Sequence, residues 1–276
     1  DCQTLGMTAD TDDDNDGVAD SSDDYPLNAN VHTAPAGQSV SVALNLLPQT
    51  SNSVSGTAAG TAQDSRSVTY TLVSSPSYSS SFTLNASTGA YSYATTETVS
   101  RADTFTYTVN DGFVDSATAT VTINLNTDPL YKYQWHLNNT GQTNFATTAG
   151  SSGEDLTVSS QIVAGRTGAG VVVAVVDSGL ELAHEDLAAN IVSDGSHDFV
   201  GNDSDPTPSA SGGDHGTSVA GIIAAVGWNN KGVRGVAPAA SLKGFNFLAS
   251  TTYANFTSAL GGETYSNDVD IFNGSY

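Results

Sequence analysis

The feature that most constrains this chain is an unbroken apolar run, residues 171–176, that ends in Asp177 and is followed by a helical pattern opening at His215. Such a run predicts a parallel strand buried on both faces, with Asp177 at its carboxyl end, the edge of an open α/β sheet where sites are usually built. The helix is expected to lie on the sheet through apolar residues at helical spacing, with His215 at its exposed tip. These residues are Val219, Ile222, Ile223 and Val226. The imidazole can then face Asp177.

The sequences Asp-Ser-Gly at 177–179 and Asp-His-Gly-Thr-Ser at 214–218 resemble the aspartate and histidine motifs of subtilisin-like serine proteases, in which the chain order is aspartate, histidine, serine. A serine hydroxyl is a poor nucleophile until an imidazole takes its proton, and a buried carboxylate orients that imidazole. The resemblance therefore implies that Asp177 orients His215 and that His215 moves the proton.

The motif that would carry the serine, Gly-Thr-Ser-x-x-x-Pro, is not found, because the one Gly-Thr-Ser is part of the histidine motif. The segment 269–276 resembles the strand that lines the substrate cleft, so its last residues are expected to pair with a protein or peptide substrate. These are Gly274, Ser275 and Tyr276. We expect residues 127–276 to be the N-terminal half of a partial α/β protease domain with a parallel sheet, inactive alone for lack of the nucleophile.

Residues 128–142 resemble the entry segment of the kexin-like branch of this family. Kexin-like enzymes that prefer paired basic residues usually have a second acid directly after the catalytic aspartate, and Ser178 stands there instead. Asp214, beside His215, is still able to face a basic side chain. Ser178 and Asp214 are therefore candidate substrate-binding residues, and a preference for dibasic sites stays open.

The same resemblance implies calcium ions bound by oxygen ligands, which Ca²⁺ prefers. One site would use side chains of Asp155, Asp186 and Asn229, with Asn230 as the alternative to Asn229, and the carbonyls of Val226, Lys231 and Val233. A second would lie in the acidic loop 193–214. Its ligands would be Asp198, Asp203 and Asp205, although Thr207 stands where the family has an acid, and a merely solvated loop is the alternative.

Residues 1–30 contain a loop in which oxygen-bearing residues recur at calcium-loop spacing around Gly17, which permits the sharp turn. The loop positions are Asp12, Asp14, Asp16, Val18 through its carbonyl, Asp20 and Asp23. With its short final acid, the segment resembles a thrombospondin type 3 repeat. The alternative is a solvated acidic spacer.

Residues 31–126 alternate apolar and polar residues with period two, the pattern of half-buried strands. The alternating positions are Val40, Val42, Leu44 and Leu46, then Val68, Tyr70 and Leu72, then Phe105, Tyr107 and Val109, and finally Val121, Ile123 and Leu125. With turn sequences between them, they predict an all-β, Ig-like sandwich of about seven strands. The segments 84–93 and 103–112 resemble cadherin-like tandem repeats. The module is expected to act as a spacer, with a contact to the cell surface or matrix as the alternative.

Composition excludes some partners. With 29 acidic and 7 basic residues and a net charge of -22, the surface repels phosphates, so no nucleic acid is expected. No apolar run is long enough to span a membrane. The lone Cys2 has no partner within the chain. Calcium modules and family point to a secreted or cell-surface protein. The competing functions are a non-catalytic, calcium-dependent adhesion or spacer protein and one half of a split protease.

Overall fold

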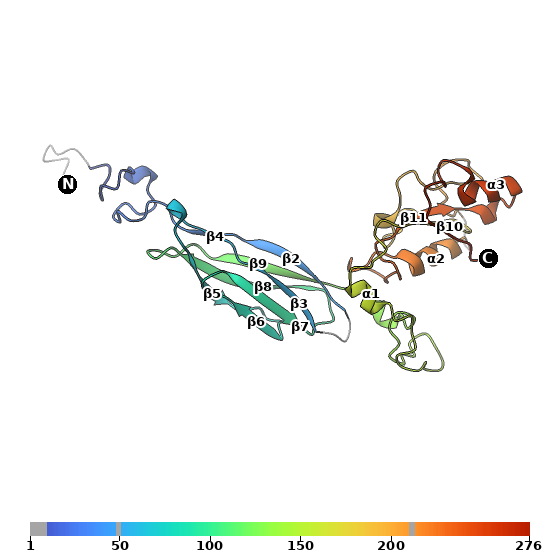
Figure 1. The fold of residues 1–276 in the computed structure, drawn as a ribbon, viewed down its shortest axis with the longest axis horizontal. Helices are drawn as coiled ribbons and strands as arrows, with labels where there is room; N and C mark the ends of the chain where they lie inside the picture. The colour runs from blue at the N-terminus through green and yellow to red at the C-terminus, as the bar shows by residue number, and fades with distance from the viewer. Residues whose placement is uncertain (1–9, 48–50, 210–212) are drawn as a thin grey trace. The chain divides into compact units, whose positions relative to one another are not determined.

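The computed structural model describes residues 10–47, 51–209 and 213–276. Within the chain, contacts define two compact units, Asp1–Asn126 and Thr127–Tyr276 (Figure 1). Residues 1–9 of the predicted calcium repeat, with Cys2, lie outside the described residues.

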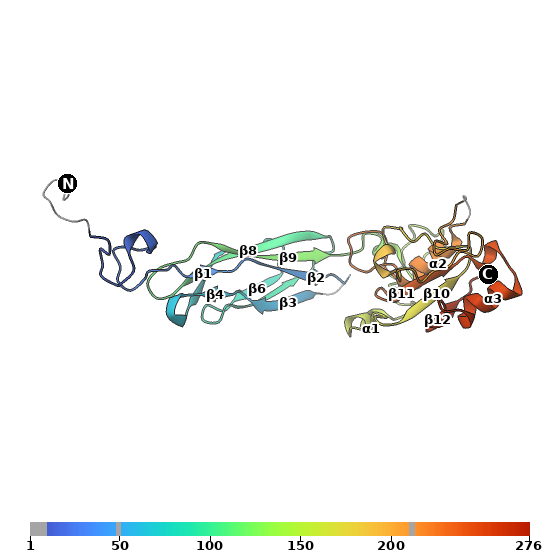
Figure 2. The ribbon, with the colours of Figure 1, turned by 90° about the horizontal axis from the view of Figure 1, so that it is seen from above.

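The first unit contains a sandwich of two sheets (Figure 2). One sheet has the order β2-β9-β8-β5, in which β2 and β9 run parallel and the other neighbours antiparallel. The other has the antiparallel order β3-β7-β6, and β1 and β4 form a small ladder of their own. The strands are β1 Ala36–Gly37, β2 Val40–Asn45, β3 Asn52–Thr57, β4 Gly60–Thr61, β5 Thr69–Ser74, β6 Ser81–Leu84, β7 Ala90–Thr95, β8 Arg101–Asn110 and β9 Ala119–Asn126.

The core of the sandwich lies between the two sheets and is rich in aromatic rings. Phe105 on β8 packs against Phe82 on β6 and Tyr91 on β7, with ring centroids 4.7 and 5.2 Å apart. Most of the alternating positions predicted from the sequence face this core. Leu72 was predicted to do so as well, but it is 38% exposed, next to a register shift between Leu72 and Ser74 in the pairing of β5 with β8.

The second unit is built on the parallel sheet β11-β10-β12, as the apolar run predicted. Its strands are β10 Val172–Val176, β11 Ser241–Phe245 and β12 Ile271–Asn273. The central strand β10 pairs along one edge with β11, beginning with Val172 opposite Ser241. Along its other edge it pairs with β12. Because hydrophobic clusters pack on both faces of the sheet, the side chains of β10 from position 173 to 176 are buried.

The helix α2, His215–Ala224, packs on β10 and β11 (Figure 1). Its buried positions are Gly216, Ala220 and Ala224, with Val219 and Ile223 partly buried beside them. The predicted apolar face was wrong in two places, since Ile222 is 56% exposed and Val226 lies beyond the end of the helix. Small residues four apart let the helix approach the sheet closely, which shifts the buried stripe by part of a turn.

The remaining helices of the second unit are short: α1 is Ser159–Val163 and α3 is Tyr253–Thr257. A π-type turn, Ser258–Gly262, continues α3. In the described part of the chain, no helix has the length and apolar character needed to traverse a membrane.

Candidate active site and calcium loops

Asp177 is fixed in the sheet by its backbone and is fully buried. Its amide donates to the carbonyl of Phe245 over 2.9 Å, and its carbonyl accepts from the amide of Leu248 over 3.0 Å. The carboxylate oxygen Oδ1 accepts from the amide of Ser178 over 2.6 Å. The other oxygen, Oδ2, has no hydrogen-bond partner among the described residues.

His215 is the first residue of α2, and its side chain is 55% exposed. Its Nδ1 lies 2.8 Å from Oδ1 of Asp177, so strand and helix bring the two side chains together. Because Nδ1 is engaged by the carboxylate, Nε2 is the ring nitrogen left to exchange a proton with a substrate or nucleophile. A buried carboxylate beside a half-exposed imidazole is the arrangement that general-base chemistry requires.

The glycines of the two motifs allow this close approach. A Cβ at Gly216 would lie 2.2 Å from the carbonyl oxygen of Gly179 and 3.0 Å from the Cβ of Asp177. Gly179 itself has a φ of 132°, a region that favours glycine. The helix therefore begins against the backbone that follows β10, where no larger residue fits.

The predicted substrate-binding residues lie near this pair or after β12. The hydroxyl of Ser178 is bound to backbone, donating to the carbonyl of Gly213 over 2.9 Å and accepting from the amide of Gly216 over 3.1 Å. Asp214 is exposed at the N-cap position of α2, and its side chain makes no capping bond. The last three residues follow β12 in an exposed segment: Gly274, Ser275, whose hydroxyl donates to Asn273 over 2.8 Å, and Tyr276, whose ring lies 5.8 Å from that of Phe247.

Comparison with known proteins agrees with this geometry. Residues 168–276 match the model of the subtilase family. This part of the chain is thus similar to the subtilases. An extracellular serine protease of Aeromonas sobria is 45% identical over 152 residues, which cover 54% of this chain and 24% of that protein. Neuroendocrine convertase 2 of Rattus norvegicus is 35% identical over 159 residues, covering 56% of this chain and 24% of that protein.

The crystal structure of the Aeromonas sobria serine protease is similar to part of this chain, with a TM-score of 0.53 and 44% identity. The match covers 55% of this chain and 26% of that one. The chain thus spans about a quarter of the length of these relatives. The predicted family, with relatives among the convertases of the kexin-like branch, is confirmed.

In the subtilase segment, the loop 226–233 packs around Asp186, which is 3% exposed. The side-chain amide of Asn229 donates to Oδ1 of Asp186 over 2.8 Å, and the amide of Val233 donates to Oδ2 over 2.8 Å. The alternative ligand Asn230 points elsewhere, because its Oδ1 accepts from the amide of Thr127 over 3.1 Å. The structure therefore joins Asn229, rather than Asn230, to Asp186.

Hydrogen bonds with backbone amides also surround the other residues of this predicted calcium site. The Oδ1 of Asn229 accepts from the amide of Lys231 over 2.9 Å, and the amide of Val226 donates to the carbonyl of Asp186 over 2.8 Å. Asp155 accepts from the amides of Asn139 and Thr157, and these hydrogen bonds lower the pKa of its carboxyl. In this arrangement, both carboxylate oxygens of Asp186 accept from N–H donors. An ion would bind there only after the side-chain amide of Asn229 rotated so that its oxygen faced the site.

The acidic loop is organised around Asp198. Its carboxylate accepts from the amides of Val200 and Gly201 over 2.8 Å and from the side chain of Asn246. Burial raises the pKa of Asp198, but these hydrogen bonds, led by that of Asn246, outweigh it and leave the pKa below its usual value. Asp203 and Asp205 each accept an amide two residues along the chain, from Asp205 and Thr207. Local hydrogen bonds thus account for the shape of this loop without a cation.

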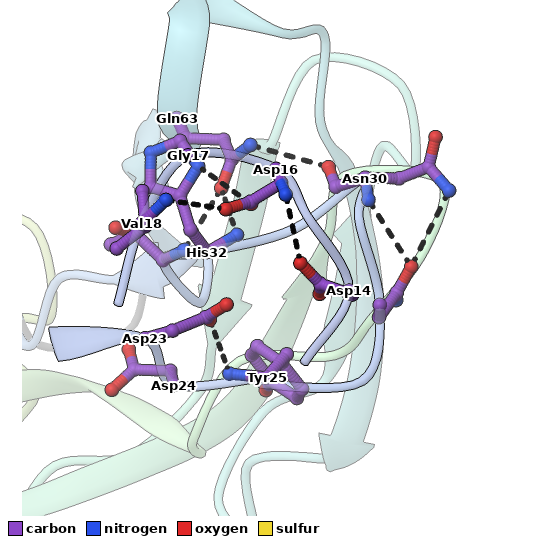
Figure 3. A network of polar contacts seen from close by, with 12 residues as sticks. Asp14, Asp16, Gly17, Val18, Asp23, Asp24, Tyr25, Asn30, His32 and Gln63 are labelled. Atoms are coloured by element: carbon purple, nitrogen blue, oxygen red, sulfur yellow. Dashed lines mark hydrogen bonds and ion pairs between the residues drawn. The ribbon is translucent and has the colours of Figure 1, made fainter. Parts of the chain in front are cut away.

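The N-terminal loop is different, because its carboxylates gather and several of their buried oxygens have no hydrogen-bond donor among the described residues. Single carboxylate oxygens of Asp12, Asp14 and Asp16 lie within 4.8 Å of one another, the one such trio in the described part of the chain. Asp23 is buried, and one of its carboxylate oxygens accepts from the amide of Tyr25 over 2.6 Å (Figure 3). Buried oxygens of Asp12, Asp14 and Asp23 find no hydrogen-bond partner in residues 10–47, 51–209 and 213–276.

The turn of this loop also follows the predicted spacing. Gly17 has a φ of 97° and donates its amide to Asp12 over 3.1 Å. The amide of Val18 donates to Asp16 over 2.8 Å. Asp20 instead accepts from the amide of Asp13 over 2.9 Å, so its carboxylate closes the loop.

Sequence reasoning missed the buried ion pair between Asp128 and Arg234, which attaches the entry segment to the end of the loop 226–233. Arg234 is fully buried, and its Nε donates to Asp128 over 2.7 Å. Its guanidinium carbon lies over the rings of Trp228 and Tyr131, 3.9 and 4.4 Å from their centroids. Gln134 donates to the carbonyl and accepts from the amide of Arg234 over 2.8 and 2.9 Å. Burial raises the pKa of Asp128, and Arg234 opposes that rise. The one signal in the sequence was that Arg234 follows an apolar residue, Val233, in a chain with only seven basic residues.

Proposed function

We propose that this chain is the part of a secreted, calcium-dependent subtilisin-like serine endopeptidase that supplies the aspartate and histidine of the catalytic triad. The observation that carries the proposal is the contact of 2.8 Å between the buried carboxylate of Asp177 and the half-exposed imidazole of His215. The match of this segment to the subtilases supports the same reaction class.

In this proposal, Asp177 holds the proton on Nδ1 of His215, so that Nε2 accepts the proton of a serine hydroxyl as that hydroxyl attacks the peptide carbonyl. Asp177 then stabilises the imidazolium, which returns the proton to the leaving amine. The serine lies outside residues 1–276. Substrate would lie along the segment 274–276 after β12, with Asp214 facing the side chain next to the cleavage site.

The test uses the full-length protein that contains residues 1–276. A fluorophosphonate probe should label its serine, and His215→Ala should reduce labelling and peptide hydrolysis by about 10⁴-fold or more, because no base remains to activate the hydroxyl. His184→Ala serves as the matched control and should leave both unchanged. Equal labelling of His215→Ala and the unaltered protein would refute the proposed role.

The calcium part of the proposal rests on the N-terminal loop. Ca²⁺ would be held by the carboxylates of Asp12, Asp14, Asp16 and Asp23 and the carbonyl of Val18, a set of hard oxygen ligands. What supports it is the presence of buried, unpartnered oxygens on three of these side chains, among the described residues. Without a cation, such oxygens would cost free energy and repel one another.

Calcium binding is measured by titration calorimetry on the chain. Asp14→Asn should weaken it at least tenfold, since it removes one negative ligand from the trio, whereas Asp13→Asn, one residue away, should not. Ca²⁺ at 100 times its Kd should stabilise the folded state by about 2.7 kcal/mol. A melting curve that does not move in excess chelator would contradict the structural role of the ion.

Secretion and the role of the sandwich remain parts of the proposal. An extracellular relative and a calcium-binding loop support a location outside the cell, where Ca²⁺ is abundant. The sandwich is proposed as a spacer, with contact to the cell surface or matrix as its alternative role.

A further inference from the structure

The N-terminus of α2 lacks a capping side chain of its own. Asp214 occupies the N-cap position in a helical conformation, with φ -84° and ψ -4°, and its carboxylate makes no capping bond. The first amides of a helix have no partner within the helix and need an acceptor from elsewhere. The helix that carries His215 would therefore begin with an unsatisfied amide if nothing else supplied an acceptor.

Ser178 supplies it from the end of β10. Its Oγ accepts from the amide of Gly216, the second residue of α2, over 3.1 Å and donates to the carbonyl of Gly213 over 2.9 Å. Its own amide donates to Oδ1 of Asp177 over 2.6 Å. One residue thus touches the carboxylate that orients the imidazole and both sides of the turn that presents it.

This use leaves the hydroxyl no proton and one lone pair for a substrate. A serine hydroxyl has one proton to donate, and Gly213 takes it. A hydroxyl that contacted a basic substrate side chain would have to accept from it while still accepting from Gly216. The geometry instead resembles an N-cap in which the serine comes from another element of the fold.

We propose that Ser178 is a positioning residue: by capping α2 from the end of β10, it holds His215 against Asp177, and it does not select the substrate. The inference rests on the proposed protease function. An ordinary N-cap stabilises a helix by about 1 kcal/mol, but this one also fixes the gap between two elements that each carry half of the catalytic pair. Its loss therefore affects the reaction more than the binding of substrate.

The experiment compares Ser178→Ala and Ser178→Thr in the full-length protein, using two peptides that differ only in a basic or an apolar residue next to the cleavage site. Ser178→Ala should lower kcat about fivefold to tenfold for both peptides, with KM within about twofold, because the imidazole is less often in place. Ser178→Thr keeps the hydroxyl and should restore kcat.

Hydrogen exchange at the amide of Gly216 provides a readout that needs no activity. Exchange should be faster in Ser178→Ala than in the unaltered protein by about fivefold or more and return to normal in Ser178→Thr. An unchanged exchange rate would refute the cap. A change in KM for the basic peptide alone would refute positioning in favour of substrate selection.

The two proposals fail in different ways. An unaltered full-length protein without activity would overturn the protease function and the catalytic role of the cap, yet exchange at Gly216 would still decide whether Ser178 caps α2. Full activity in Ser178→Ala would overturn the positioning role while leaving the protease function intact.

Discussion

The buried pair of Asp128 and Arg234 gives the sharpest test of how the second unit is held together. Asp128→Asn removes one charge while keeping the shape of the side chain and an acceptor for the amide of Asn229, which donates to it over 3.2 Å. The side chain of Arg234 is 1% exposed, so its charge has no access to water. In the described part of the chain, Nη1 and Nη2 of Arg234 make no hydrogen bond that would replace the lost one.

Removing one partner of a buried ion pair costs about 3–5 kcal/mol, because the other charge stays buried and unpaired. For a unit of this size, each kcal/mol lowers the Tm by about 2–4 °C, so a fall of about 6–20 °C is expected. The raised pKa of Asp128 reflects the cost of burying its charge. Replacing both residues, as Asp128→Leu with Arg234→Met, should therefore cost less than Asp128→Asn alone.

Tryptophan fluorescence during thermal unfolding measures this change, because Trp135 and Trp228, the two tryptophans of the chain, both lie in the second unit. Glu97→Gln is a control in the first unit, where circular dichroism follows unfolding because both tryptophans lie in the second; it removes the partner of Arg101 in an ion pair of 3.5 Å whose side chains are about one-third exposed. Exposed pairs contribute about 0–1 kcal/mol, so that Tm should hardly move. A loss below 1 kcal/mol in Asp128→Asn would refute the reasoning.

Two further predictions concern α2 and the central sheet. Gly216→Ala should destabilise the second unit by about 1–3 kcal/mol, because its Cβ would lie 2.2 Å from the carbonyl oxygen of Gly179. Gly221→Ala in the same helix meets open space and should stabilise the unit by about 0.5–1 kcal/mol. Urea unfolding of the two variants measures both free-energy changes. The hydrogen bond from buried Lys243, 2.6 Å long, lowers the pKa of Asp268. The stabilisation from this ion pair is present above the unfolded pKa of about 3.9 and is lost as the pH falls through the folded value. Urea unfolding between pH 5 and pH 2.5 should therefore show a loss that is smaller in Asp268→Asn than in the unaltered protein.

Much of the fold could be predicted because its signals are local. The apolar run before Asp177 has no polar position, as a strand covered on both faces requires, and it forms the middle of the parallel sheet. Alternation in the sandwich placed Phe105, Tyr107 and Val109 on the buried face, where all three have 0% exposure. Leu72 had the same alternation, but a register shift between two strands is a property of the pair that one strand's sequence does not contain.

The candidate site was predictable in its chemistry and less so in its support. Asp177 and His215 are marked by residue type and neighbours. The capping hydrogen bond, in contrast, joins Ser178 to Gly216, which are 38 residues apart in the sequence. The ion pair of Arg234 with Asp128 joins residues 106 positions apart in the sequence. Neither leaves a periodic or spaced pattern, since hydrogen-bonding partners across such distances are chosen by the folded chain and not by local propensity.

The parallel pairing of β2 with β9 has a mechanical consequence. Six residue pairs, from Val40 opposite Val121 to Asn45 opposite Asn126, join the early strand of the sandwich to its last strand. Because the two strands run in the same direction, the chain enters the sandwich at one end and leaves at the other. A pulling force between these ends loads the ladder of hydrogen bonds in shear, so that they must break together and not one after another. A force along the polypeptide would therefore not peel this pair of strands apart from one end.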